Sequence, residues 1–188
     1  MSEKSFNRIS AYLLTLVVVF VLCHLLWEYL NGGVLSHHLL NRSDYPAISN
    51  WWEIIILPLL AWFSITRVKK RILVQPDQGS FGGTIPKGIL IGFFGMLLIS
   101  ITQSVIFQFG YENITMYIAL GVVLIGLFLP IYRAECILGH VLGASFTFGP
   151  VIPIIGIIVI ASISAFSNIL VKPLLLKIWG IFKKERSS

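Results

Sequence analysis

Histidine and carboxylate side chains gather between residues 24 and 53, at the end of one apolar segment and the start of the next. His24 and Glu28 are four residues apart, so a helix places them on one face about one turn from each other. Glu53 opens the second apolar segment. A titratable side chain inside a membrane helix is costly unless it is paired, bound to a metal or in contact with water. We therefore expect a functional site where these two segments meet.

The loop between the two segments adds more groups that could bind a metal or carry protons. Imidazole and carboxylate ligands of this kind suit zinc, copper or iron(II). The predicted ligands of a divalent metal ion are His24, Glu28, His37, His38 and Glu53. Ser36 and Asp44, in the same loop, are the candidate catalytic residues.

Each of these residues also has a purely structural interpretation. Asn50-x-x-Glu53 matches a helix capping box, in which Glu53 would only satisfy backbone donors. His37 and His38 could be solvated in an outer loop, and Asp44 before Tyr-Pro is a common turn residue. The first His/Glu pair could be a simple hydrogen bond along its helix. The sequence contains no H-E-x-x-H motif that would settle the choice.

Ser36 and Asp44, together with two histidines, form a set that resembles the Ser/His/Asp set of membrane ceramidase-like hydrolases. That family carries a paired HxxxH on a late helix. This chain has only His140 there, so we assign it to no family.

His140 is a second candidate site residue, because it lies between two glycines that allow another helix or a cofactor to come close. We predict it as a cofactor-binding residue, and with His24 it could hold haem, which is less favoured than a divalent metal. Two other polar groups have structural explanations. Glu135 is expected to pair with the neighbouring Arg133 at the surface, and the stripe Ser100, Ser104 and Gln108 to bond to neighbouring helices.

The elements that position these residues are predicted to be membrane helices. The chain has 188 residues, of which 56% are hydrophobic and only 12% charged, about half the charged share of a soluble domain. It is predicted to be an all-α, polytopic bundle forming one membrane domain over residues 1–188. The predicted spans are 11–31, 50–67, 88–109, 114–132, 131–148 and 151–171, followed by an amphipathic interfacial helix at 173–184. The last two spans could instead form a re-entrant hairpin.

The distribution of positive charge predicts the topology. In the six-span arrangement, 13 of the 14 Lys and Arg residues fall on one side, and only Arg42 falls on the other. By the positive-inside rule both termini are then cytoplasmic, and the candidate site faces outward. The net charge of +6 is explained by this topology, so no nucleic-acid partner is expected. We expect a bacterial inner membrane as the location, the lipid bilayer as partner, and a homo-oligomer as an open possibility.

Three functions fit these residues. The first is a metal-dependent intramembrane hydrolase acting on a lipid-like substrate, with the metal activating water. The second is a small oligomeric transporter or channel in which His24 and Glu28 form the ion or proton site. The third is a non-catalytic subunit that binds haem or serves assembly. Whether the protein is an enzyme stays open from the sequence.

Overall fold

The computed structural model describes residues 3–38, 44–74 and 85–185 of the chain. Within these ranges the regular structure is helical apart from one short two-stranded hairpin, which confirms the all-α prediction. The helices are α1 (Glu3–Leu30), α2 (Glu53–Val74), α3 (Lys87–Gln108), α4 (Glu112–Phe128), α5 (Ala134–Phe148), α6 (Val151–Phe166) and α7 (Lys172–Glu185), with a 3-10 turn η2 (Asn50–Trp52) and a π-helical turn η3 (Ser167–Val171). The strands are β1 (Ser36–His38) and β2 (Ala47–Ser49).

Four stretches of the described chain are helical, long and apolar enough to cross a membrane. They are Glu3–Leu30, Asn50–Ile72, Lys87–Gln108 and Val151–Gly180. The helices α4 and α5 are also apolar but have only 17 and 15 residues. A helix needs roughly 20 residues to cross the hydrocarbon layer. The structure thus supports four spanning helices, and the predicted total of six stays a prediction.

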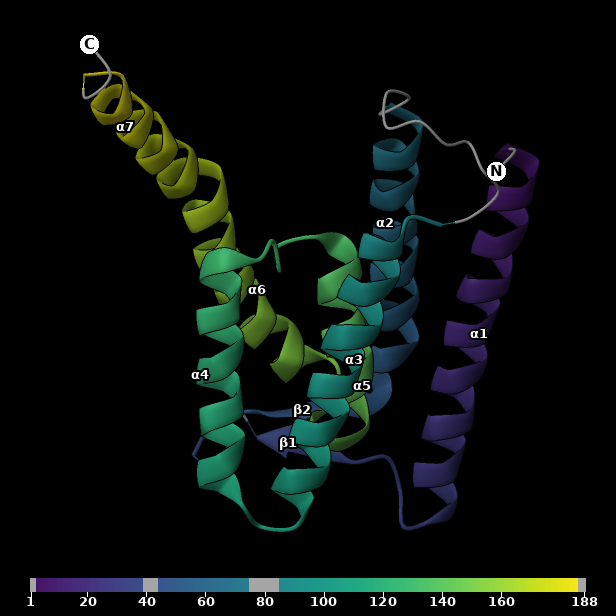
Figure 1. Cartoon of the computed structure of the whole chain (residues 1–188). Coiled ribbons are helices and arrows are strands. Elements are labelled where there is room, and N and C mark those ends of the chain that lie inside the picture. Colours follow the sequence, from purple (N-terminus) through teal and green to yellow (C-terminus); the bar gives the residue numbers. More distant parts are fainter. Residues whose placement is uncertain (1–2, 39–43, 75–84, 186–188) are drawn as a thin grey trace.

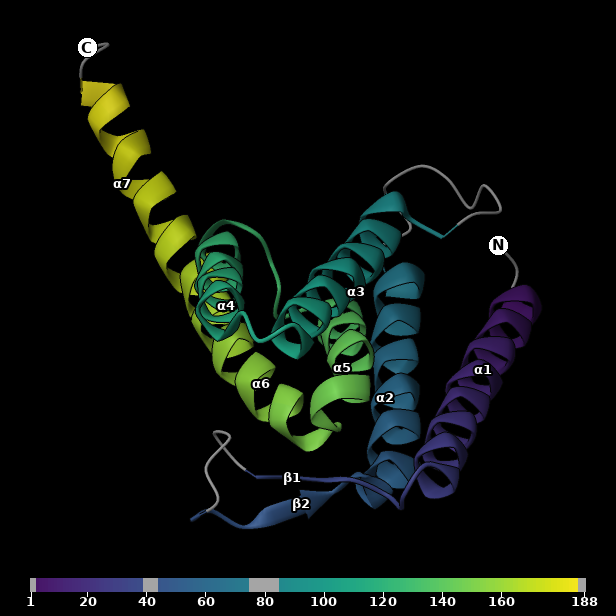
Figure 2. The ribbon, with the colours of Figure 1, turned by 90° about the horizontal axis from the view of Figure 1, so that it is seen from below.

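The C-terminal helix does not begin after a break, as the predicted boundary between residues 171 and 173 implied. Instead α6 continues through the π-helical turn η3 directly into α7. In Figures 1 and 2 this helical stretch runs up beside α4, and α7 then extends away from the other helices. That residues 173–184 lie on the membrane surface stays a prediction.

Helix α5 lies in the middle of the bundle and contacts α2, α3 and α6 (Figure 2). Its closest neighbour is α3, because Gly139 and Gly143 have no side chains to keep the two backbones apart. A Cβ at Gly139 would overlap the carbonyl oxygen of Phe93, and one at Gly143 would lie 2.7 Å from that of Leu97. The two glycines therefore allow the short distance between the backbones of α3 and α5.

Hydroxyl groups of α3 reinforce this contact. Ser100 Oγ donates to the carbonyl oxygen of His140 at 2.6 Å, and Ser104 Oγ donates to that of Gly143 at 3.2 Å. One turn further along, Gln108 Nε2 donates to Thr147 Oγ1 at 2.9 Å. The prediction that this polar stripe bonds to a neighbouring helix is confirmed.

Ion pairs join helix ends at the end of the bundle where the N-terminus lies (Figure 1). Lys69 Nζ at the end of α2 lies 2.9 Å from Glu3 Oε1 at the start of α1. Arg71, also on α2, pairs with Glu135 at the start of α5 at 2.5 Å. The predicted partner of Glu135, its neighbour Arg133, was therefore wrong, because a residue of another helix reaches the carboxylate. The β-hairpin lies at the opposite end of the bundle (Figure 1).

Candidate functional site

Two glycines end α1 and redirect the chain toward β1. Gly32 and Gly33 have φ values of 120° and 106°, which side chains other than glycine rarely adopt. The chain then enters β1, which pairs antiparallel with β2 so that His37 is opposite Ile48. Because successive strand residues point to opposite faces, His37 is half-buried whereas Ser36 and His38 on either side of it are exposed.

The centre of the site is a hydrogen bond between α1 and α2. His24 Nδ1 lies 2.8 Å from Glu53 Oε2, and the two residues are 5% and 0% exposed. A carboxylate on one ring nitrogen fixes the orientation of the imidazole and leaves the other nitrogen, Nε2, directed away from it. This pairing was not predicted from the sequence, which grouped Glu53 with the metal ligands or with the helix cap.

Glu28 is held by the loop and by η2. Its Oε1 accepts from Asn50 Nδ2 at 2.6 Å, and its Oε2 accepts from the backbone N–H of Leu35 at 3.2 Å. His24 Nε2 faces the same carboxylate at 3.6 Å from Oε1, which is too long for a hydrogen bond. Glu28 is 2% exposed, so donors of the protein rather than bulk water satisfy its side-chain oxygens.

Several buried polar atoms of this cluster have no hydrogen-bond partner. Buried polar groups in folded proteins are nearly always paired, so each exception requires an explanation. In the described part of the chain, unpaired buried side-chain atoms are found on five residues, and four of these belong to the site. The four atoms are His24 Nε2, His37 Nε2, Asn50 Oδ1 and Glu53 Oε1.

The turn between α5 and α6 closes over the loop at Gly149. This residue has φ 63°, and a Cβ there would overlap Asn50 Oδ1 and lie 3.5 Å from His37 Cδ2. Burial lowers the pKa of His37 below its usual range, although the charge of Glu28 acts in the opposite direction. The lowered pKa favours the neutral form of His37, which is the form that binds metal ions.

Aromatic rings cover the remaining side of the site. The ring of Phe146, on the last turn of α5, is centred 4.8 Å from that of His24 and 5.7 Å from that of Trp27. Phe20, one turn before His24 on α1, stacks on the imidazole with ring centres 6.1 Å apart. The imidazole is thus enclosed by α1, α2 and α5.

The other predicted site residues of the loop lie outside this cluster. Ser36, His38 and Asp44 are exposed. His38 Nδ1 contacts the carbonyl oxygen of Tyr45 at 2.7 Å, which directs its ring along the hairpin. The structure brings His24, Glu28 and Glu53 together with His37 beside them, while a catalytic role for Ser36 or Asp44 stays a prediction.

The capping-box interpretation of Asn50 and Glu53 was wrong. The cap of the following turn is Ser49, whose Oγ accepts from the backbone N–H of Trp51. The side chain of Asn50 instead donates to Glu28, and that of Glu53 contacts His24. Asn50 is the site residue that the sequence argument missed, because the capping pattern offered a local explanation for a long-range contact.

His140 lies deeper in the bundle than the cluster. It precedes Phe146 by six residues, about 9 Å of helix rise. Its side chain is buried and its Nδ1 has no partner, whereas its backbone carbonyl accepts from Ser100. A cofactor-binding role for His140, with or without His24, stays a prediction.

Over the described ranges, no three His, Cys, Asp or Glu side chains already have the spacing of a metal site. Comparison with known proteins adds no assignment to this geometry. No protein-family model matches the chain, and neither do any curated protein sequences or solved structures.

Proposed function

We propose that the chain is an integral membrane protein that binds a divalent metal ion through His24 Nε2, Glu28 and His37 Nε2. The observation that carries this proposal is the set of unpaired buried atoms at the site. Two of them are imidazole nitrogens, and histidine is the commonest metal ligand in proteins. We infer that one metal ion is the missing partner of both nitrogens, which requires the side chains to move closer together, because in the described residues they do not have the spacing of a metal site.

The separation between His24 Nε2 and Glu28 Oε1 supports this assignment. Two zinc ligands that are each about 2.0–2.1 Å from the ion lie about 3.3 Å apart in tetrahedral geometry. The observed 3.6 Å is therefore longer than a hydrogen bond and only slightly longer than a ligand-to-ligand distance. Small rotations of the two side chains would produce the spacing that an ion requires.

Glu53 and Asn50 have positioning roles in this proposal. Glu53 contacts Nδ1 of His24, on the other side of the ring from Nε2. Metal-binding histidines usually donate their second ring N–H to a carboxylate, which orients the ring and raises its basicity. Asn50 orients Glu28 in the same way. The two proposed ligands on α1 are therefore each oriented by a hydrogen bond, His24 by Glu53 and Glu28 by Asn50.

Charge balance also favours a divalent cation. In the state that binds a metal ion, with ionised carboxylates and neutral histidines, the buried residues Glu28 and Glu53 carry two negative charges. Buried charges destabilise a fold unless they are compensated. One divalent ion brings the site to a net charge of zero.

A hydrolase is the activity that this site supports best. A bound zinc-type ion supplies Lewis acidity and lowers the pKa of its water toward neutrality. The cluster lies at the end of apolar helices, where the proposed topology places the headgroups of the outer leaflet. We therefore propose a lipid-like ester or amide as the substrate class.

The first test is the metal content of the purified protein. Protein purified in detergent after growth with zinc should retain about one ion per chain by elemental analysis. His37→Ala should lose most of it, whereas the matched control His38→Ala should not, because that ring lies on the exposed face of the same strand. Equal metal content in the two variants would contradict the assigned ligands.

The second test separates metal binding from hydrolysis. Zinc-loaded protein should cleave a fluorogenic lipid ester or amide, and chelation should abolish the signal. Metal binding without cleavage would refute the hydrolase and favour a metal carrier. Absence of metal, combined with loss of proton flux in Glu28→Gln proteoliposomes, would favour the transporter interpretation instead.

A further inference from the structure

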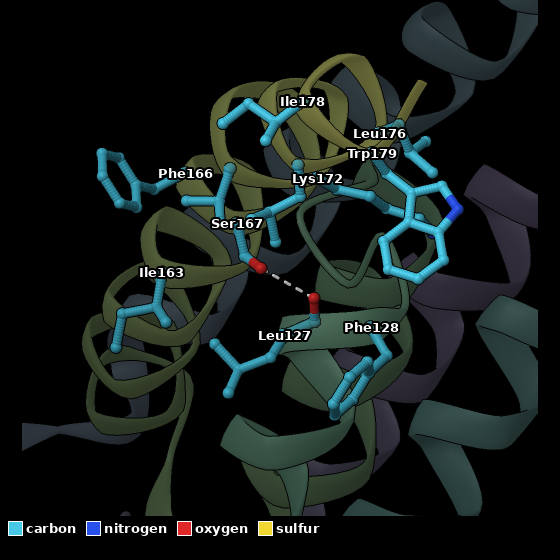
Figure 3. Close-up of a pocket in the computed structure, with 11 residues that line it drawn as sticks. Leu127, Phe128, Ile163, Phe166, Ser167, Lys172, Leu176, Ile178 and Trp179 are labelled. Carbon is cyan, nitrogen blue, oxygen red and sulfur yellow. Dashed lines mark hydrogen bonds between the residues drawn. The ribbon is translucent and has the colours of Figure 1, made fainter. Parts of the chain in front are cut away.

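A large groove opens between the end of α4 and the junction of α6 with α7. Its volume is about 980 Å³, near the upper end of the range of about 300–1,000 Å³ that is typical of ligand pockets. Figure 3 shows Ile163 of α6 on one side and Phe128 of α4 with Trp179 of α7 on the other. The lining is apolar except for Ser167 and Lys172.

Hydrogen bonds to α4 hold the helix junction in place below this groove. Ser167 Oγ donates to the carbonyl oxygen of Leu127 at 2.7 Å (Figure 3). The next residue, Asn168, donates through Nδ2 to the carbonyl oxygen of Gly126 at 3.0 Å. The hydroxyl of Ser167 is thus used within the fold. Among the residues that the structure describes, Lys172 is the one charged group that lines the groove.

The π-helical turn explains why the groove does not close. Both hydrogen-bonding residues lie in η3, which is wider than an α-helix and often marks a functional position. Past this turn α7 diverges from α4 (Figures 1 and 2). The apolar faces of Phe128 and Leu176 therefore line open space rather than packing on each other.

The groove lies at the basic end of the molecule. In Figure 1 the end of α2, which carries Lys69 and Arg71, and the start of α7 lie toward the same end as both termini. In the proposed topology this end faces the cytoplasmic leaflet, which is rich in anionic lipids. A lysine next to an apolar groove is complementary to a phospholipid, in which a negatively charged phosphate is attached to apolar acyl chains.

We propose that this groove binds one anionic phospholipid of that leaflet. An acyl chain lies along Phe128 and Leu176, and the headgroup phosphate pairs with Lys172. The proposal rests on the membrane topology given above but not on the metal site, so metal content does not test it.

Native mass spectrometry of the full chain in detergent tests whether the charge of Lys172 selects an anionic lipid. With phosphatidylglycerol and phosphatidylcholine as probes, the wild-type protein should retain one molecule of phosphatidylglycerol in preference to phosphatidylcholine. Lys172→Gln should lower that retention about fivefold, the factor for a contact of about 1 kcal/mol. The control Lys177→Gln, on the same helix but outside the lining, should not. Equal retention of both lipids, or equal loss in both variants, would overturn the proposal.

A second pair of variants tests whether the phospholipid binds in this groove. Leu176→Trp fills the groove and should reduce phosphatidylglycerol retention, whereas Leu174→Trp, on a part of α7 outside the lining, should not. Crosslinks from a diazirine-bearing phosphatidylglycerol should map to the end of α4 and to α7. Dimers with crosslinks between α4 of one copy and α7 of another would show that a second chain fills the groove, which would overturn lipid binding.

Discussion

Asn50 holds the carboxylate on which the proposed site depends. Its Nδ2 donates to Glu28 Oε1 at 2.6 Å, and both residues are almost fully buried. Asn50→Ala should lower stability by about 1–3 kcal/mol, because a buried charged acceptor loses its donor. The control Asn31→Ala removes an exposed amide that bonds to Trp27 and should cost much less. Thermal unfolding in detergent, followed by tryptophan fluorescence, compares the two; equal shifts would contradict the importance of the buried bond.

Changing Glu28 or Glu53 to glutamine should reduce metal binding to different extents. Glu28→Gln removes a proposed ligand and should abolish metal retention. Glu53→Gln keeps an oxygen near His24 Nδ1 and should weaken metal binding by about 10–100-fold, as loss of an orienting partner does. Titration of metal-free protein with zinc measures both. If Glu53→Gln proves the more damaging variant, Glu53 is itself a ligand and the assigned roles are reversed.

At the scale of the elements, the contact between α3 and α5 depends on the absence of side chains. A methyl group at Gly139 would overlap the backbone of Phe93, so Gly139→Ala should destabilise the protein by about 1–3 kcal/mol through overpacking. Gly121→Ala on α4 is the matched control, because a Cβ there has nothing within 4 Å. Unfolding midpoints in detergent should fall only for Gly139→Ala.

The helices themselves could be predicted from apolar runs and from their Gly and Pro boundaries, but two junctions could not. The predicted boundary at Pro173 implied a break in the helix, but the chain passes through the π-helical turn η3 into α7 without leaving the helical conformation. Glu135 was assigned to its sequence neighbour because the position of Arg71 beside it depends on how α2 packs against α5. Local patterns predict elements better than they predict the contacts between them.

For the molecule as a whole, the position of the site could be predicted but its internal arrangement could not. The spacing of His24 and Glu28 correctly indicated a shared face, and the structure places Glu53 and His37, two of the other predicted ligands, beside them. Strand pairing decided which of His37 and His38 faces inward, and a three-residue strand carries no hydrophobic alternation to reveal this. The contact of Phe146 with His24 could not be predicted, because it depends on how α5 packs and the two residues are 122 positions apart in the chain.

The orientation of the whole molecule gives the last prediction. The ion pairs Lys69–Glu3 and Arg71–Glu135 bring the starts of α1 and α5 to the end of α2. Since 13 of 14 basic residues fall on this side in the predicted arrangement, it should be cytoplasmic. Alkaline phosphatase, which folds only outside the cytoplasm, should be inactive when fused after Ser188 and active when inserted beside Arg42. Activity at Ser188 together with activity beside Arg42 would require an odd number of spans, and it would move the groove of α7 to the outer leaflet.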